Sequence, residues 1–209
     1  MVAPASLRRP LHVAAYNLAV YRRTWRGSVI VSFFAPLLYL ASMGLGLGSL
    51  VNRGAGSVGG LRYLDFVATG LLGATAMQTG MTEATYPVMG KLQWLHIYEA
   101  MLNTPLTVRD IVAGECFWQV LRLLMVSVLF LVVMTVFGVL HSPLALLCIP
   151  VGVLIGLAFS MPILAFTSTQ RRDSAFAALN RFLVLPLFLL SGTFFPVASL
   201  PAVLQAVAW

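Results

Sequence analysis

Six polar side chains follow one another at helical spacing inside an otherwise apolar stretch. Because they lie three or four residues apart, a regular helix would place them on one face. Glu83 is the ionisable acid of this stripe, and a carboxylate in so apolar a setting usually faces a bundle interior or a watery path. Two interpretations stay open: the stripe lines a substrate path, or it makes hydrogen bonds between helices. Its members are Thr75, Gln78, Thr79, Thr82, Glu83 and Tyr86.

A second polar group lies near the beginning of another apolar run. Glu115 and Arg122 are seven residues apart, which is about two turns of a helix, so their side chains can share a face. We interpret them as a polar pair that faces a helix bundle, or as long side chains that reach back to polar surroundings.

Other reactive groups are scattered. The six acidic residues and three histidines fall in different connections, so we expect neither a metal site nor a convergent catalytic group. Gly90 and Lys91 are followed by Leu92, without the spacing of a P-loop, so the chain is not expected to bind ATP for hydrolysis. Cys116 and Cys148 are expected in opposite leaflets, where they serve packing and cannot form a disulfide.

The composition indicates an integral membrane protein. Hydrophobic residues make up 60% of the 209 residues and charged residues only 9%, whereas about a quarter of a soluble domain is charged. The apolar runs are long enough for helices, which need about 20 residues to cross a bilayer and satisfy their own backbone groups. We therefore predict an all-α polytopic protein, with spans at about 28–50, 63–84, 111–137, 144–166 and 180–197.

The basic residues fall on alternate connections. Apart from Arg53 and Arg62, all Lys and Arg lie in the N-terminal arm, in residues 91–122 or in residues 171–181. By the positive-inside rule these segments are cytoplasmic, as is the N-terminus. The membrane thus explains the net charge of +7, and no nucleic-acid partner is expected.

The N-terminal 27 residues are predicted to form a cytoplasmic arm. Residues 11–25 have the pattern of an amphipathic helix that lies in the membrane interface, with Trp25 as an anchor. Residues 28–209 form the membrane domain. Two GxxxG pairs, Gly44 with Gly48 and Gly152 with Gly156, favour close helix packing, either within the chain or at a subunit contact.

The longest polar segment between apolar runs is residues 91–115, which we call the elbow. An amphipathic helix is predicted over 92–102, and Asn103-Thr104-Pro105 would end it because proline disfavours the α conformation before it. Thr107 and Asp110 have the spacing of a capping box for the next helix. The elbow is either a surface helix or a rigid element on which a soluble partner acts.

Three stretches, Phe66–Met77, Trp94–Glu115 and Leu190–Pro201, resemble ABC-2-type transporter permeases. Within that family the similarity is to nodulation-factor (lipo-oligosaccharide) and daunorubicin-type drug export permeases. The resemblance implies a type V exporter-like permease at the plasma (inner) membrane, with five of an expected six transmembrane helices in this chain. It also implies an external re-entrant segment at 194–209.

The resemblance also implies partners and a division of labour. A second permease protomer, as a homo- or heterodimer, and ATP-binding cassette ATPase subunits would complete the exporter, with ATP and Mg bound by the ATPase. The substrate would be a drug, lipid or lipo-oligosaccharide, and multidrug or antibiotic efflux is one such activity. Residues 88–110 would form the coupling loop, with Leu92, Trp94, Leu95, Glu99, Leu102, Thr104 and Pro105 as coupling residues, and Thr75, Gln78, Thr79, Thr82 and Glu83 would line the substrate path.

Two other classes of membrane protein fit the sequence less well. A secondary transporter or channel would normally carry ionisable residues deep in several spans or show matched halves with broken helices, and this chain shows one stripe and no internal repeat. A membrane enzyme on lipid substrates would need converging catalytic groups.

Overall fold

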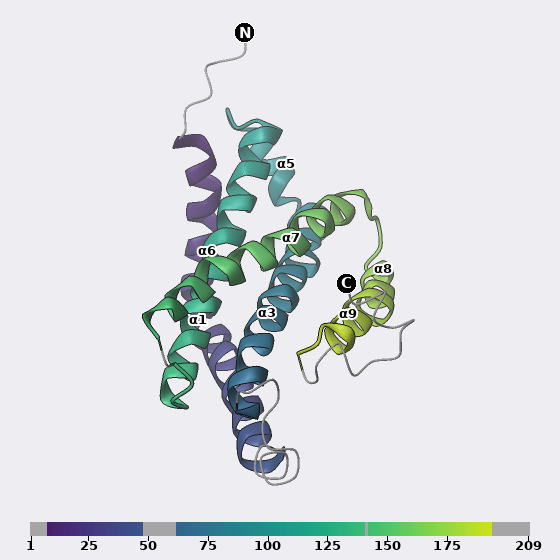
Figure 1. The fold of residues 1–209 in the computed structure, drawn as a ribbon. Coiled ribbons are helices and arrows are strands. Elements are labelled where there is room, and N and C mark those ends of the chain that lie inside the picture. The colour runs from purple at the N-terminus through teal and green to yellow at the C-terminus, as the bar shows by residue number, and fades with distance from the viewer. Residues whose placement is uncertain (1–7, 48–61, 141, 194–209) are drawn as a thin grey trace.

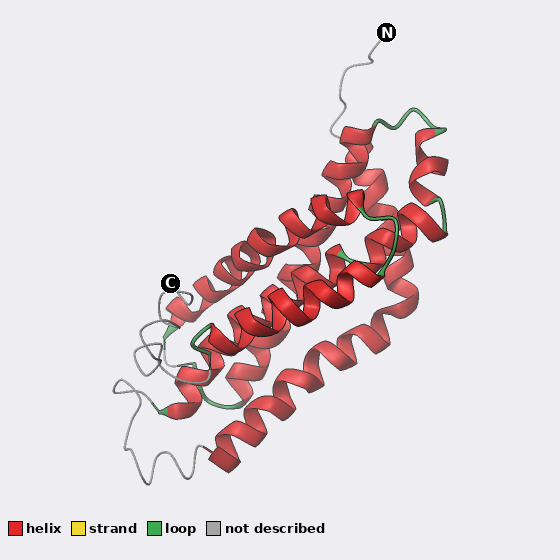
Figure 2. Ribbon diagram, turned by 90° about the vertical axis from the view of Figure 1, so that its right-hand side faces the viewer, coloured by secondary structure: helices red, strands yellow, loops and turns green. Residues whose placement is uncertain are grey.

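The structure is a computed structural model that describes residues 8–47, 62–140 and 142–193. Every regular element in these ranges is helical, which confirms the all-α prediction for them. The long helices lie side by side (Figure 1; Figure 2). The helical elements, long and short, are α1 (Arg8–Ala41), π-helical η1 (Ser42–Leu47), α3 (Tyr63–Ala84), α4 (Tyr86–Met89), π-helical η2 (Gly90–Trp94), α5 (Ile97–Leu102), α6 (Val108–Val136), 3₁₀-helical η3 (Pro143–Leu147), α7 (Cys148–Thr169), α8 (Ser174–Leu179), π-helical η4 (Asn180–Val184) and α9 (Leu185–Leu190).

α1 differs from the prediction of an interfacial helix followed by a separate span. It continues without a break from Arg8 to Ala41, and Gly27 lies within it. α1 packs along α6, and this packing supplies the stabilisation that carries a helix past a residue of low helix propensity. The predicted boundary at residue 27 is therefore not a helix boundary.

Small residues bring α3, α6 and α7 close together. A Cβ atom added at Gly80 of α3 would lie 2.5 Å from the carbonyl oxygen of Gly156 on α7. One added at Gly156 would collide with the side chain of Leu123 on α6, and one at Gly152 would lie 2.8 Å from the Oγ atom of Ser127. Gly152 and Gly156 therefore serve packing within one chain, which corrects the alternative of a subunit contact. Gly48 lies outside the described residues.

The predicted spans agree with the helices to different degrees. The stretches 63–84 and 111–137 coincide closely with α3 and α6, whereas the fifth apolar run is helical from Ser174, six residues before the predicted start. Two stretches, Val108–Val136 and Pro143–Thr169, are long and apolar enough to cross a membrane by length and composition. The expected re-entrant segment, 194–209, lies outside the described residues.

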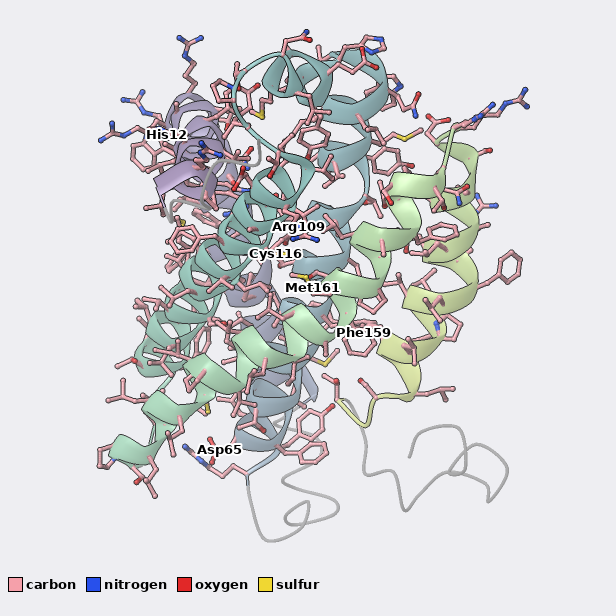
Figure 3. The ribbon with its side chains drawn as sticks, turned by 90° about the horizontal axis from the view of Figure 1, so that it is seen from above. His12, Asp65, Arg109, Cys116, Phe159 and Met161 are labelled. Atoms are coloured by element: carbon pink, nitrogen blue, oxygen red, sulfur yellow. The ribbon has the colours of Figure 1, made fainter. Side chains whose placement is uncertain are left out.

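Connections assigned to the same side of the membrane meet at the same end of the bundle. Within the elbow, the side-chain amide of Gln93 donates to the carbonyl oxygen of Gln170, beyond α7, at 3.5 Å. At the other end, Arg62 donates to the carbonyl oxygen of Gly138 at 3.3 Å, which joins the beginning of α3 to the turn after α6. His12 and Asp65 lie at these two opposite ends (Figure 3).

Candidate functional site

The elbow contains a break that the sequence pattern did not predict. η2 ends at Trp94 and α5 begins at Ile97, so the helix predicted over 92–102 is divided. His96 has a left-handed backbone, with φ of 49°, which few residues other than glycine adopt. Its Nδ1 atom lies 3.2 Å from a carboxylate oxygen of Glu99. The amphipathic pattern of 92–102 concealed this change of direction, because it contains neither glycine nor proline.

The connection between α5 and α6 begins and ends where the sequence predicted. α5 ends at Leu102, before Asn103-Thr104-Pro105. The backbone N–H of Thr107 donates to Asp110 at 2.9 Å and the backbone N–H of Asp110 donates to the Thr107 hydroxyl at 3.4 Å, which confirms the capping box. α6 therefore has a defined first turn at the point where the elbow enters it.

A small apolar cluster supports the elbow from beneath. Val13 of α1, Val88 of α4, Tyr98 of α5 and Ile111 of α6 are buried together, and Leu92 packs against them. Of the predicted coupling residues, Leu92 therefore contributes to the support and is only partly buried.

The other predicted coupling residues lie outside the apolar cluster. Trp94, Leu95 and Leu102 are 57%, 67% and 45% exposed, and Glu99, Thr104 and Pro105 are exposed as well. α5 lies at the same end of the molecule as the beginnings of α1 and α6 (Figure 1). The elbow thus presents large apolar side chains at one end of the bundle.

An ion pair joins the first and last residues of the elbow. The Lys91 ammonium lies 2.8 and 2.9 Å from the two carboxylate oxygens of Glu115, and the side-chain amide of Asn17 on α1 donates to the same carboxylate at 3.1 Å. Glu115 and Asn17 are buried. Burial of the Tyr98 hydroxyl, together with the nearby negative charge of Glu115, raises the pKa of Tyr98, so this phenol stays protonated. Sequence reasoning missed Lys91, Asn17 and Tyr98.

A second ion pair lies two helical turns further along α6. Arg122 donates from Nε to a carboxylate oxygen of Glu83 at 2.8 Å and from Nη1 to the Tyr21 hydroxyl at 3.2 Å, and it also donates to Ser28. Its guanidinium carbon lies 5.0 Å from the centre of the Tyr21 ring. Glu115 and Arg122 both face the bundle, but the expected pair between them is wrong, because Glu115 pairs with Lys91 and Arg122 with Glu83.

The polar stripe on α3 faces two different cavities. Gln78 and Thr82 line a cavity of about 220 Å³ whose far wall is α8, η4 and the beginning of α9. Glu83 lines a cavity of about 310 Å³ on the other side, beside α1 and Lys91. Thr75 and Thr79 are half-buried. Glu83 therefore faces a different cavity from Gln78 and Thr82, and it forms an ion pair with Arg122.

The two cysteines lie apart, as predicted. Cys116 on α6 lies next to Met161 on α7, with 3.5 Å between their sulfur atoms (Figure 3), and Cys148 packs at the edge of another apolar cluster. Both are free thiols. Among the described residues no group of His, Cys, Asp and Glu has the arrangement of a metal site.

Comparison with known proteins agrees with the resemblance seen in the sequence. The family model for the ABC-2 type transporter matches residues 11–209. Nodulation protein J of Rhizobium leguminosarum bv. viciae is 32% identical over 198 residues, which cover 91% of this chain and 75% of that protein. The protein of the same name from Rhizobium meliloti (strain 1021) is 30% identical, covering 91% of this chain and 74% of that protein. That of Bradyrhizobium diazoefficiens is 29% identical, covering 93% of this chain and 76% of that protein.

No solved structure matches the chain. The family match spans nearly the whole sequence, and the relatives named above cover about nine-tenths of it. The chain belongs to the ABC-2 type transporter family, whose members are membrane transport proteins.

Proposed function

We propose that this chain is the membrane-spanning permease subunit of an ATP-binding cassette exporter, and that the elbow is where a separate ATPase subunit docks. The observation that carries the proposal is the elbow's combination of an exposed apolar surface with a fixed base. Trp94, Leu95 and Leu102 are exposed, and the Lys91–Glu115 ion pair holds the two ends of the elbow together. Such a surface can receive a partner and pass its displacement to the helices behind it.

In this proposal the ATPase subunit hydrolyses ATP and this subunit forms the transport path. The chain has no P-loop sequence, so ATP and Mg²⁺ belong to the ATPase partner and this subunit supplies the path. A partner that favours one state of the bundle by about 5.5 kcal/mol shifts its population from 1:99 to 99:1. That free energy has to reach the helices through the elbow.

The chain is further proposed to lie in the plasma (inner) membrane with five spans and a cytoplasmic N-terminus. The basic residues support this orientation, because the elbow and the connection after α7 meet at one end of the bundle and both carry Lys or Arg. A second permease protomer would complete the path across the membrane.

The substrate is proposed to be hydrophobic or amphipathic, with a lipo-oligosaccharide, a drug or a lipid as candidate cargo. The similarity to proteins named nodulation protein J supports the first of these. The cavity lined by Gln78 and Thr82 combines uncharged polar groups with apolar side chains such as Met81 and Val184, which suits an amphipathic molecule.

Docking on the elbow can be tested by capture of the ATPase. The partner to use is an ATP-binding cassette ATPase from the same organism, with the permease purified in detergent. Glu99→Lys and Leu102→Asp should each lower capture at least tenfold, because they change the charge or the apolar surface of the exposed face. Leu144→Asp is the matched control, since Leu144 is equally apolar and 70% exposed but lies in η3. Undiminished capture by both elbow variants would contradict the proposal.

A further inference from the structure

The two ion pairs join the same two stretches of chain in an antiparallel register. Going along the chain from α3 into the elbow, Glu83 comes first and Lys91 eight residues later. Going back along α6, Arg122 comes first and Glu115 seven residues earlier. The order is acid then base on one stretch and base then acid on the other, and the distances are 2.8 Å in both pairs.

This order of charges excludes other registers. If the stretch from α3 to η2 shifted along α6 by two turns, about 10 Å, Lys91 would meet Arg122 for one direction of the shift and Glu83 would meet Glu115 for the other. Like charges would then be buried against each other, since the side chains of Glu115 and Arg122 are only 4% and 8% exposed. A shift of one turn would leave all four charges without their partners, which buried charges tolerate poorly.

α1 reinforces the same register. Asn17 donates to Glu115, while Tyr21 and Ser28 accept from Arg122, so both α6 members of the two ion pairs are also held by α1. A Cβ at Gly114 would lie only 2.5 Å from the Cβ atom of Val13, which shows how closely α1 approaches α6 beside the first pair.

We infer that the ion pairs Lys91–Glu115 and Glu83–Arg122 fix the register of the stretch from α3 to η2 on α6, so that the beginning of the elbow moves together with α1 and α6 and does not slide along them. Lys91 and Glu115 are positioning residues in this arrangement. Buried polar pairs that specify register are a well-attested use of charges in proteins. The role of this register in coupling rests on the function proposed above, whereas the register itself does not.

The register can be measured on the permease without any ATPase. Spin labels are placed on cysteines introduced at Ala100 of α5 and Phe117 of α6, both exposed, with Cys116 and Cys148 replaced by serine. Pulsed electron paramagnetic resonance in lipid nanodiscs then gives the distance between the labels. The native register predicts one narrow distribution. Lys91→Glu should broaden it at least twofold or add a population displaced by two helical turns, about 10 Å, because the reversed charge at position 91 would then lie opposite Arg122.

Charge exchange is the decisive comparison. Lys91→Glu combined with Glu115→Lys restores the opposite charges and should return the narrow distribution, because the Asn17 amide can turn its oxygen towards the new lysine. Gln119→Leu is the matched control: Gln119 is buried on α6 between the two pairs, and its amide has no hydrogen-bond partner in the described part of the chain. It should leave the distance unchanged whatever it does to thermal stability.

The outcomes separate the two proposals. An unchanged distribution in Lys91→Glu, or a broad one in the charge-exchanged protein, would overturn the register inference. If the single variant does not fold, the charge-exchanged protein decides alone: a folded protein with the narrow distance supports the inference, and an unfolded one overturns it. Loss of ATPase capture by Leu102→Asp tests the proposed function separately, because Leu102 lies outside both ion pairs.

Discussion

Lys91 shows how one side chain changes the meaning of a segment. In the sequence it is one of several basic residues that indicate a cytoplasmic connection, but in the structure its ammonium contacts both oxygens of Glu115. Its side chain is 14% exposed. A pair this far from water is expensive to break, because the remaining charge stays buried.

Removing the charge of Lys91 should therefore destabilise the protein. Lys91→Met leaves the Glu115 carboxylate unpaired, and breaking such a buried pair costs about 3–5 kcal/mol. Lys91→Arg keeps the charge and should lose much less. Thermal unfolding in nanodiscs, followed by the fluorescence of a thiol-reactive dye, compares them. Equal midpoints for the two variants would show that the ion pair contributes little.

The polar stripe yields a prediction that differs from residue to residue. Gln78→Ala and Thr82→Ala should change transport rate or substrate range while leaving the amount of protein unchanged, since both residues line the cavity facing α8. Glu83→Ala should instead lower the amount of folded protein, because it leaves Arg122 buried without its carboxylate. Transport by inside-out vesicles and immunoblotting measure the two effects. If Glu83→Ala changed transport and left the amount of folded protein unchanged, Glu83 would belong to the substrate path.

At the scale of elements, α3 and α7 approach each other closely because glycines line their contact. Gly80 faces the backbone of Gly156, and Gly152 and Gly156 in turn receive Leu72, Leu123 and Ser127. Helices in a bilayer gain little from burying apolar surface against one another, so close approach of this kind supplies much of their association.

Gly80→Ala should accordingly separate α3 from α7. The new methyl group would lie 2.5 Å from a backbone oxygen, and overpacking of this kind costs about 1–3 kcal/mol. Gly27→Ala is the control, because nothing lies within 4 Å of the added Cβ and alanine favours the helix by about 1 kcal/mol. The midpoint of thermal unfolding should fall for the first variant and stay or rise for the second. A fall in both would indicate that the close contact is not the cause.

For the whole molecule, the arrangement of charge predicts its orientation. The elbow and the connection after α7 share one end of the bundle, while Arg62 and Gly138 share the other. The long α1 runs from one of these ends towards the other (Figure 1). Arg22, Arg23 and Arg26 are exposed in the middle of α1, and we expect them to lie at the level of the lipid headgroups.

Cysteine labelling tests that orientation directly. In a protein with Cys116 and Cys148 replaced by serine, a cysteine at Ala100 should react with a membrane-impermeant maleimide only after the cells are opened. A cysteine at Ser142, at the other end of α6, should react in intact cells. Both positions are exposed. Labelling of Ala100 from outside intact cells would reverse the topology and remove the elbow from the reach of any ATPase.

The sequence by itself determined the class of protein and several local features. Apolar runs as long as a bilayer is thick require helices whatever their neighbours are, and the Thr107–Asp110 capping box depends on residues three apart, so both follow from short-range chemistry. The family could likewise be identified from motifs in residues 66–77, 94–115 and 190–201. The interpretation of residues 11–25 as a separate helix was wrong because it gave no weight to packing of α1 on α6.

Only the tertiary structure decided which charges meet. Glu115 and Arg122 share a face of α6 whatever their partners are, and spacing alone could not tell a pair between them from pairs with Lys91 and Glu83, 24 and 39 residues away. The left-handed backbone at His96 was equally hidden, since it arises where η2 and α5 must both contact the cluster around Val13. Helical periodicity describes a single helix, and the partner of a buried charge is set by which other helix lies opposite it.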